Sequence, residues 1–202
     1  MASGHFHPTK EALIHTVLEL LETQSVDVIS SDEVLEKSGI SKGSMYHHFE
    51  DFSDLLEHAQ VARFASYVDR SIDSISALLV IQDKAEFEEG LQGVTRYTQS
   101  EALKESRLHR VTAISRAGVS ERMRVHLAEE QARLTAALAD LFREVVNRGW
   151  GNPQLEPQTL AVFIQAYTIG IVVNDYVDEK MNMENWLWLI DTIMSDVLMK
   201  TN

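Results

Sequence analysis

The sequence predicts an all-α protein in which an N-terminal three-helix module precedes a larger helical domain. The only prolines are Pro8, Pro153 and Pro157, so the long stretch between the first two contains no proline that would break a helix. Apolar residues recur in this stretch at intervals of three and four, as they do on one face of a helix. No segment alternates between apolar and polar residues as a half-buried strand does.

Three short helices are predicted in the first quarter of the chain. The first begins near Thr9, its expected N-cap, and its apolar face is formed by Leu13, Ile14, Val17, Leu18 and Leu21. The second begins at Ser30, because the four residues Ser-Ser-Asp-Glu from this position fit a reciprocal capping box. Gly39 is placed to adopt the left-handed conformation that closes this helix. Ser41 then caps the third helix, which ends near residue 48.

Longer helices are predicted over the rest of the chain. A fourth begins near residue 53, and others are expected over residues 84–99, 101–117, 119–148, 156–177 and 183–199. Two helices joined by a tight glycine-containing turn, as over residues 30–48, are typical of a helix-turn-helix. We therefore predict a helix-turn-helix domain over residues 1–52 and a helical domain over residues 53–202.

Composition limits the classes of function. The chain has 202 residues, 45% of them hydrophobic, which indicates an ordered globular protein. There is no cysteine, which excludes disulfides and thiolate metal sites. The sequence shows no signal-peptide layout, and its longest apolar stretch, residues 161–173, falls short of a membrane span, so we expect a cytoplasmic protein. The net charge of -13 means that any contact with DNA must be local.

The run Ser-Gly-Ile-Ser-Lys-Gly-Ser-Met-Tyr-His-His-Phe over residues 38–49, followed by Leu55, closely resembles the TetR family of bacterial repressors. The resemblance extends from about residue 9 to residue 56, roughly a quarter of the chain. It implies a transcription regulator without a cofactor, which binds a palindromic operator in double-stranded DNA as a homodimer and is released by a ligand.

The third predicted helix has the features of a recognition helix. Its capping residue turns the N-terminal amides outward toward phosphate, and Lys42 adds a positive charge beside them. Two residues with little side-chain bulk, Gly43 and Ser44, let the helix approach base edges in the major groove. By resemblance, the DNA-facing residues are Ser41, Lys42, Gly43, Ser44, Tyr46 and His47, whereas Phe49 turns into the core.

The N-terminal region departs from the family pattern in charge. Family members usually carry a lysine three residues after the phenylalanine, whereas this chain has Phe52 there. The cations before that position are only Lys10, Lys37 and Lys42, against nine acidic residues that include the neighbouring Glu50 and Asp51. We expect fewer phosphate contacts than in relatives, and therefore DNA binding that is either weak or salt-sensitive or is assisted by histidine protonation.

The larger domain is expected to form the dimer and to bind a small apolar or amphipathic ligand. Its last two helices are apolar over more than one face, which favours contact with a second copy, although both helices could instead complete the core of one chain. Residues expected to line a ligand cavity are Phe64, Tyr67, Val94, Tyr97, His109, Leu138, Phe142 and Tyr167. Each of these residue types also occurs in ordinary cores.

Other functions were weighed against these patterns. Residues 39–43 match the G-x-S-x-G string of serine hydrolases, but that motif requires a preceding strand, and a helix is predicted there. A metal could be shared by His5 and His7, or by His47 and a neighbouring residue, yet a mobile tail and a DNA-facing pair are the simpler interpretations. No glutamate stands three residues before a histidine, so a di-iron bundle enzyme is excluded. The alternative function is a helical small-molecule-binding or interaction protein that kept the fold and lost DNA affinity.

Overall fold

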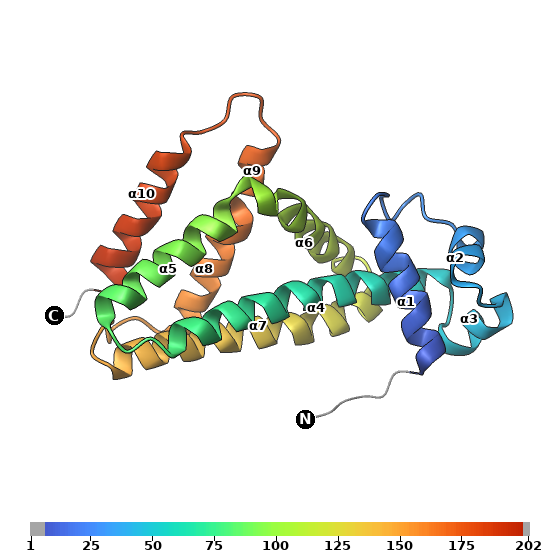
Figure 1. The fold of residues 1–202 in the computed structure, drawn as a ribbon, viewed down its shortest axis with the longest axis horizontal. Coiled ribbons are helices and arrows are strands. Elements are labelled where there is room, and N and C mark those ends of the chain that lie inside the picture. The colour runs from blue at the N-terminus through green and yellow to red at the C-terminus, as the bar shows by residue number, and fades with distance from the viewer. Residues whose placement is uncertain (1–6, 200–202) are drawn as a thin grey trace. The chain divides into compact units, whose positions relative to one another are not determined.

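A computed structural model describes residues 7–199, and the described residues form helices without any strand, which confirms the all-α prediction (Figure 1). His5 lies outside them. The helices are α1 (Pro8–Leu21), α2 (Ser31–Ser38), α3 (Lys42–His48), α4 (Phe52–Leu79), α5 (Lys84–Gln99), α6 (Lys104–Ala117), α7 (Glu121–Asn147), α8 (Pro157–Gly170), α9 (Val172–Asp175) and α10 (Met183–Ile193). A 3-10 turn (Glu101–Leu103) precedes α6, and a π-helical turn (Met194–Leu198) follows α10.

The chain forms two compact units. The N-terminal unit comprises residues 7–66 and 113–127 of the described chain, and the C-terminal unit comprises residues 67–112 and 128–199. Helices α4, α6 and α7 each contribute residues to both units. The division into functional domains at residue 52 stays a prediction.

The caps of the helix-turn-helix agree with the sequence patterns. The hydroxyl of Ser30 accepts a hydrogen bond from the Glu33 amide at 3.2 Å, and the hydroxyl of Ser41 accepts one from the Ser44 amide at 3.2 Å. Gly39 has a φ of 67°, the left-handed conformation in which a Cβ atom would be strained. The two serine caps and the glycine turn are therefore confirmed, whereas the Glu33 carboxylate, expected to complete the reciprocal capping box, accepts a hydrogen bond from Gln24 Nε2 at 2.8 Å.

The predicted cap of the first helix is wrong. Its N-cap is His7, whose Nδ1 atom accepts a hydrogen bond from the Thr9 amide at 3.3 Å. Pro8 occupies the first helical position, where its fixed φ suits a helix and its missing N–H leaves no donor unsatisfied. The helix therefore begins one residue before Thr9.

One apolar cluster holds the N-terminal unit together. Its buried members are Leu13, Val17, Leu20, Leu21, Val26, Ile29, Val34, Met45, Phe49, Leu55 and Ala59. Phe49 is 2% exposed, as predicted, and Ile40 packs against the cluster between the two helices of the motif. Phe52 also packs against it, which explains an apolar residue at this position.

In the C-terminal unit, polar contacts join α10 to α5, which lies beside it (Figure 1). The indole N–H of Trp186 donates to Gln99 Oε1 at 2.9 Å, and Arg96 forms an ion pair with Asp191 at 3.1 Å. The single helix expected over residues 156–177 is wrong, because α8 ends at Gly170, a residue of low helix propensity. None of the helices within residues 7–199 has the length and apolar character to cross a bilayer.

A buried ion pair fastens α6 to α9 and to the end of α5. The Arg107 side chain is 2% exposed, and its guanidinium donates to both carboxylate oxygens of Asp175 at 3.2 Å. Its remaining contacts are with the carbonyls of Thr98 at 3.3 Å and Ser100 at 2.8 Å. Because each of the three guanidinium nitrogens donates to an acceptor, the buried charge is well compensated.

Candidate nucleic-acid interface and ligand cavity

Most of the residues predicted to face DNA share the exposed side of α3. The exposed members are Ser41, Lys42, Gly43, Tyr46 and His47, whereas Ser44 is half-buried. Met45 is completely buried and points into the apolar cluster. The burial of Met45 and Phe49 fixes the rotation of this short helix, so the small, basic and aromatic residues are presented together.

Imidazole rings gather beside this face. The His7 and His48 ring centroids are 4.7 Å apart, and those of His47 and His48 are 5.1 Å apart. Partial desolvation lowers the pKa of His48 below its usual value, and the nearby charges of His7, His47 and Lys10 act in the same direction. These neighbours therefore disfavour the charged form of the His48 ring.

The acidic residues after α3 are bound to an arginine that lies far away in the sequence. Arg122, near the start of α7, forms ion pairs with Glu50 at 2.8 Å, Glu57 at 3.1 Å, Asp51 at 3.5 Å and Asp54 at 3.8 Å. Hydrogen bonds to Glu57 and Glu50 raise the pKa of this guanidinium further, so it stays charged. The acidic residues are evident in the sequence, but their cation could not be predicted, because no local pattern connects residues 50 and 122.

Two of these carboxylates also accept hydrogen bonds from backbone amides at the junction between α3 and α4. Asp51 Oδ1 accepts a hydrogen bond from the Asp54 amide at 2.7 Å in the first turn of α4. Asp54 Oδ2 accepts one from the Glu50 amide at 3.0 Å, and its other oxygen lies 3.1 Å from His58 Nδ1. The acidic run therefore builds the junction between α3 and α4.

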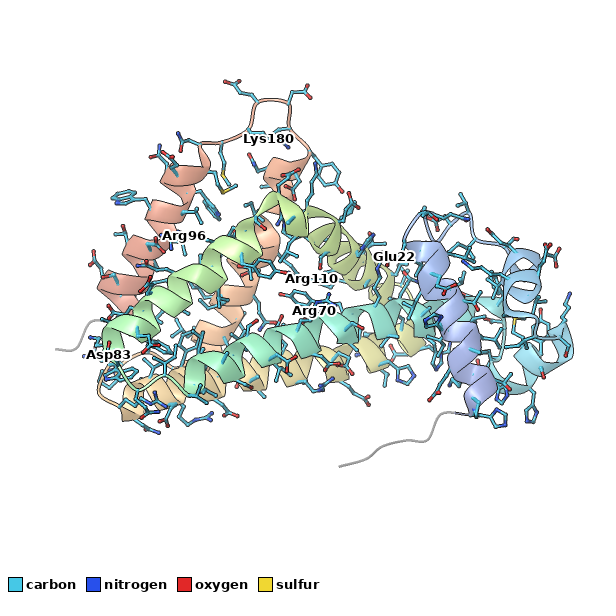
Figure 2. All side chains as sticks on the ribbon, viewed as in Figure 1. Glu22, Arg70, Asp83, Arg96, Arg110 and Lys180 are labelled. Carbon is cyan, nitrogen blue, oxygen red and sulfur yellow. The ribbon has the colours of Figure 1, made fainter. Side chains whose placement is uncertain are left out.

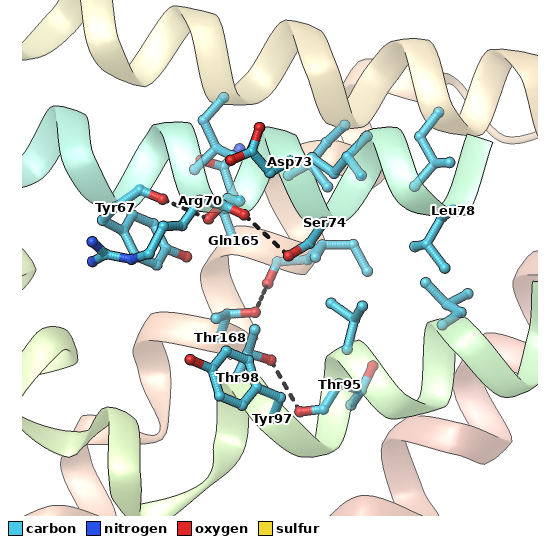
Figure 3. Close-up of a pocket in the computed structure, with 18 of the residues that line it drawn as sticks. Tyr67, Arg70, Asp73, Ser74, Leu78, Thr95, Tyr97, Thr98, Gln165 and Thr168 are labelled. Carbon is cyan, nitrogen blue, oxygen red and sulfur yellow. Dashed lines mark hydrogen bonds between the residues drawn. The ribbon is translucent and has the colours of Figure 1, made fainter. Parts of the chain in front are cut away.

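The C-terminal unit contains a cavity of about 350 Å³ lined by residues of α4, α5, α7 and α8 (Figure 3). This volume lies at the lower end of the range of roughly 300–1,000 Å³ for small-molecule sites. Of the residues predicted to line it, the cavity brings together Tyr67, Val94, Tyr97, Leu138, Phe142 and Tyr167. Phe64 and His109 do not line it, and Phe64 belongs to the core of the N-terminal unit, where it is 3% exposed.

Polar lining residues were missed by the sequence analysis. Hydroxyl groups of Ser71, Ser74 and Thr168 line the cavity and donate to carbonyls one turn earlier in their own helices. Arg70 and Asp73 also line it, although charged residues on an amphipathic helix are usually interpreted as a solvated face. Burial raises the pKa of the Tyr167 phenol, whereas hydrogen bonding with Thr95 and Thr168 lowers it less strongly.

The serine-hydrolase interpretation of residues 39–43 is excluded by the local structure. Ser41 follows helix α2 rather than a strand and caps α3, which excludes a hydrolase nucleophile elbow there. Within residues 7–199, no cluster of three or more histidine, aspartate and glutamate side chains is arranged to hold a metal ion.

No family model matches the chain. Among curated proteins, the nucleoid occlusion factor SlmA of Shewanella baltica is 22% identical over 169 residues, which cover 80% of this chain and 79% of SlmA. A solved structure from Mesorhizobium loti, assigned to the TetR family of transcriptional regulators, covers 93% of this chain and 94% of its own, with a TM-score of 0.69 and 16% identity. The chain has the TetR-family fold. A transcriptional regulator from Saccharomonospora viridis, solved in complex with choline, shares the fold with a TM-score of 0.69 and 14% identity over 95% of this chain and 97% of its own.

Replacing Arg122 with glutamine is expected to destabilise the N-terminal unit, because four carboxylates lose their shared cation. Arg124→Gln is the matched control, since Arg124 is more exposed and pairs only with Glu121, within its own helix turn. Urea unfolding would measure both variants at low salt and at about 1 M NaCl, where screening should shrink the effect. An equal loss in the two variants would contradict the role given to Arg122.

Proposed function

We propose that this chain is a DNA-binding transcription regulator that acts as a homodimer in the cytoplasm and not as an enzyme. The observation that carries the proposal is the exposed face of α3, held in orientation by the caps at Ser41 and Gly39 and by the burial of Met45. A short helix with an outward N-terminus, small residues and a lysine is suited to the major groove and its phosphates. The shared fold with a TetR-family regulator supports this assignment.

The ligand cavity supports regulation by a small molecule. The proposed role is that of a repressor that leaves a palindromic operator when the cavity is filled. For two recognition helices to enter successive major grooves they must lie about 34–36 Å apart, so a change in their spacing would release the DNA. Ligand and operator must then weaken each other's binding by the same factor.

A second candidate is a helical ligand-binding protein without DNA affinity. It is favoured by the acidic N-terminal region, in which the α3 face has only Lys42 as a permanent cation. The two functions differ in a direct test, because selection on random duplexes recovers a preferred palindrome only for the DNA-binding protein.

Lys42→Ala is expected to weaken operator binding, because a phosphate contact at the N-terminus of α3 is lost. The slope of log K against log salt should fall in magnitude by about 1.8, because the homodimer loses one phosphate contact from each subunit. Lys84→Ala is the matched control, since it removes the same charge from the start of α5 in the C-terminal unit. Fluorescence anisotropy at several salt concentrations would measure both slopes, and identical behaviour of the two variants would reject α3 as the DNA-facing helix.

Operator affinity is expected to increase as the pH falls from about 8 to 6. His48 has a lowered pKa in the free protein, and a DNA phosphate beside its ring would raise that pKa, so binding takes up a proton. The gain should extend over the pH range between the free and bound pKa values. His48→Gln should flatten the profile, whereas His15→Gln, which changes an exposed histidine of α1 paired with Glu19, should leave it unchanged. A wild-type affinity that is independent of pH would contradict the prediction.

The homodimer interface is proposed on α8 and α10, where apolar side chains remain exposed. Trp188 is 66% exposed, Val162 54% and Leu189 44%, which is more apolar surface than helices of a monomer usually present.

Trp188→Asp is therefore expected to shift the protein toward monomers, because a buried charge would oppose the interface. Val119→Asp makes the same kind of change at an exposed site of the N-terminal unit and should leave the dimer intact. Light scattering at micromolar concentration measures the mass, and a monomeric wild type would refute the interface.

A further inference from the structure

A line of side chains along α4 forms one wall of the cavity in the C-terminal unit. Tyr67, Ser71, Ser74 and Leu78 all line the cavity and recur at intervals of four, three and four, which is the spacing of a single helix face. Leu78 is 4% exposed, so this face points inward (Figure 3). The hydroxyl groups of Ser71 and Ser74 therefore face the cavity.

Neither of these two hydroxyls has a proton to offer a ligand. Ser71 Oγ donates to the Tyr67 carbonyl at 2.9 Å, and Ser74 Oγ donates to the Arg70 carbonyl at 3.0 Å. A hydroxyl group has one proton and two lone pairs. Because the proton is already donated within α4, each oxygen can only accept a hydrogen bond from a ligand.

Helices α5 and α8 contribute lining hydroxyls in the same state. Thr98 of α5 donates to the Thr95 carbonyl at 3.0 Å, and Thr168 of α8, which is 7% exposed, donates to the Ile164 carbonyl at 2.7 Å. Gln165 also lines the cavity, and its amide nitrogen donates to two protein oxygens at 3.0 and 3.1 Å. The interior of the cavity therefore presents more hydrogen-bond acceptors than donors.

The buried part of the described lining carries no charge. Among residues 7–199, the charged residues that line the cavity are Arg70 and Asp73, and both are exposed. Figure 2 shows Arg70 on α4. The buried lining residues are uncharged, and most of them are apolar, as Leu134, Leu141 and Phe142 are. An ion held among them would lose its hydration without gaining a counter-charge, which costs far more free energy than burying a neutral group.

We infer that the cavity binds an uncharged, largely apolar molecule whose one hydrogen-bond donor, such as a hydroxyl group, lies between Ser74 of α4 and Thr168 of α8 and whose apolar part extends toward Leu78. This inference rests on the proposed function, for which it names the ligand class. At roughly 30 Å³ for each group the size of a water molecule, a volume of 350 Å³ accommodates about a dozen non-hydrogen atoms.

Calorimetry on the full-length protein at about pH 7.5 tests the inference with four probes of eight carbon atoms: octan-2-ol, octan-2-one, octan-2-amine and octanoate. The alcohol and the ketone have nearly the same shape, but only the alcohol can donate a hydrogen bond. We expect octan-2-ol to bind about fivefold or more tightly than octan-2-one, which is the effect of one hydrogen bond. The amine and the carboxylate are ionised at this pH and are expected to bind about tenfold or more weakly than octan-2-ol.

Thr168→Val and Ser74→Ala each remove one acceptor with little change in side-chain shape. Each variant should lower the ratio of alcohol affinity to ketone affinity, and the double variant should leave the alcohol at most about twofold tighter than the ketone. Hydration of the free probes is the same in every titration, so a change in this ratio reports on the cavity. Retained ketone binding shows that a variant is folded and that its cavity is intact.

Thr112→Val is the matched control, because the Thr112 hydroxyl donates to the Leu108 carbonyl at 3.0 Å on α6 and does not line the cavity. This variant should keep the wild-type ratio, and a loss equal to that of the double variant would overturn the inference. It is also overturned if wild type binds either ion more tightly than octan-2-ol, if the ketone binds as tightly as the alcohol, if no probe binds, or if the double variant keeps the wild-type ratio.

No DNA is present in these titrations. Failure of operator binding would therefore reject the proposed regulator function while leaving the ligand class standing, and failure of octan-2-ol binding would do the reverse.

Discussion

The excess of carboxylates over cations is the constraint on which much of this structure depends. Acidic side chains outnumber basic ones, so the number of carboxylates does not limit how many ion pairs form. Which carboxylate an arginine binds is decided by the helices that bring the two side chains together. The buried pair of Arg107 and Asp175 shows the result inside the C-terminal unit, where one guanidinium joins α6, α9 and the end of α5. Removing two charges from water costs desolvation free energy, and this cost is offset when the buried groups are fully hydrogen-bonded.

In the N-terminal unit the excess of acidic residues would oppose DNA binding if no cation neutralised their charge. Glu50 and Asp51 lie just after α3, the helix proposed to face DNA, and their charges would repel phosphate groups. Arg122 neutralises part of this field, and the capping contacts of Asp51 and Asp54 give the carboxylates a structural role. The charge balance of this surface therefore involves three elements, α3, α4 and the start of α7.

The sequence predicted best what is decided locally. Helix caps and tight turns depend on residues within one helical turn, so they can be predicted without knowledge of the tertiary structure. This holds for the caps at Ser30 and Ser41 and for the turn at Gly39. Local information also failed where two signals competed, since Pro8 moved the start of α1 away from Thr9. Boundaries in the C-terminal unit were less accurate, because tertiary packing there decides where a long apolar segment bends or ends.

Contacts between residues that lie far apart along the chain could not be predicted from the sequence. Arg122 and Glu50 are 72 positions apart, and nothing in either segment indicates the other. The aromatic and apolar residues that line the cavity could be predicted as a group, because large apolar side chains of helices point into the protein interior. The same side chains would point inward if the interior contained no cavity. The cation–π contact between Arg110 and Tyr67 could not be predicted, since the two residues lie on different helices.

Release of DNA by a ligand places a thermodynamic requirement on the cavity. Tight binding alone cannot release DNA, because a ligand shifts an equilibrium only by the difference in its affinity for two arrangements. Tyr67 and Arg70 line the cavity and belong to α4, the helix that also begins at the Arg122 junction, so one helix contributes to both units. A ligand of this cavity can therefore act on DNA binding only if its affinity differs between two arrangements of α4.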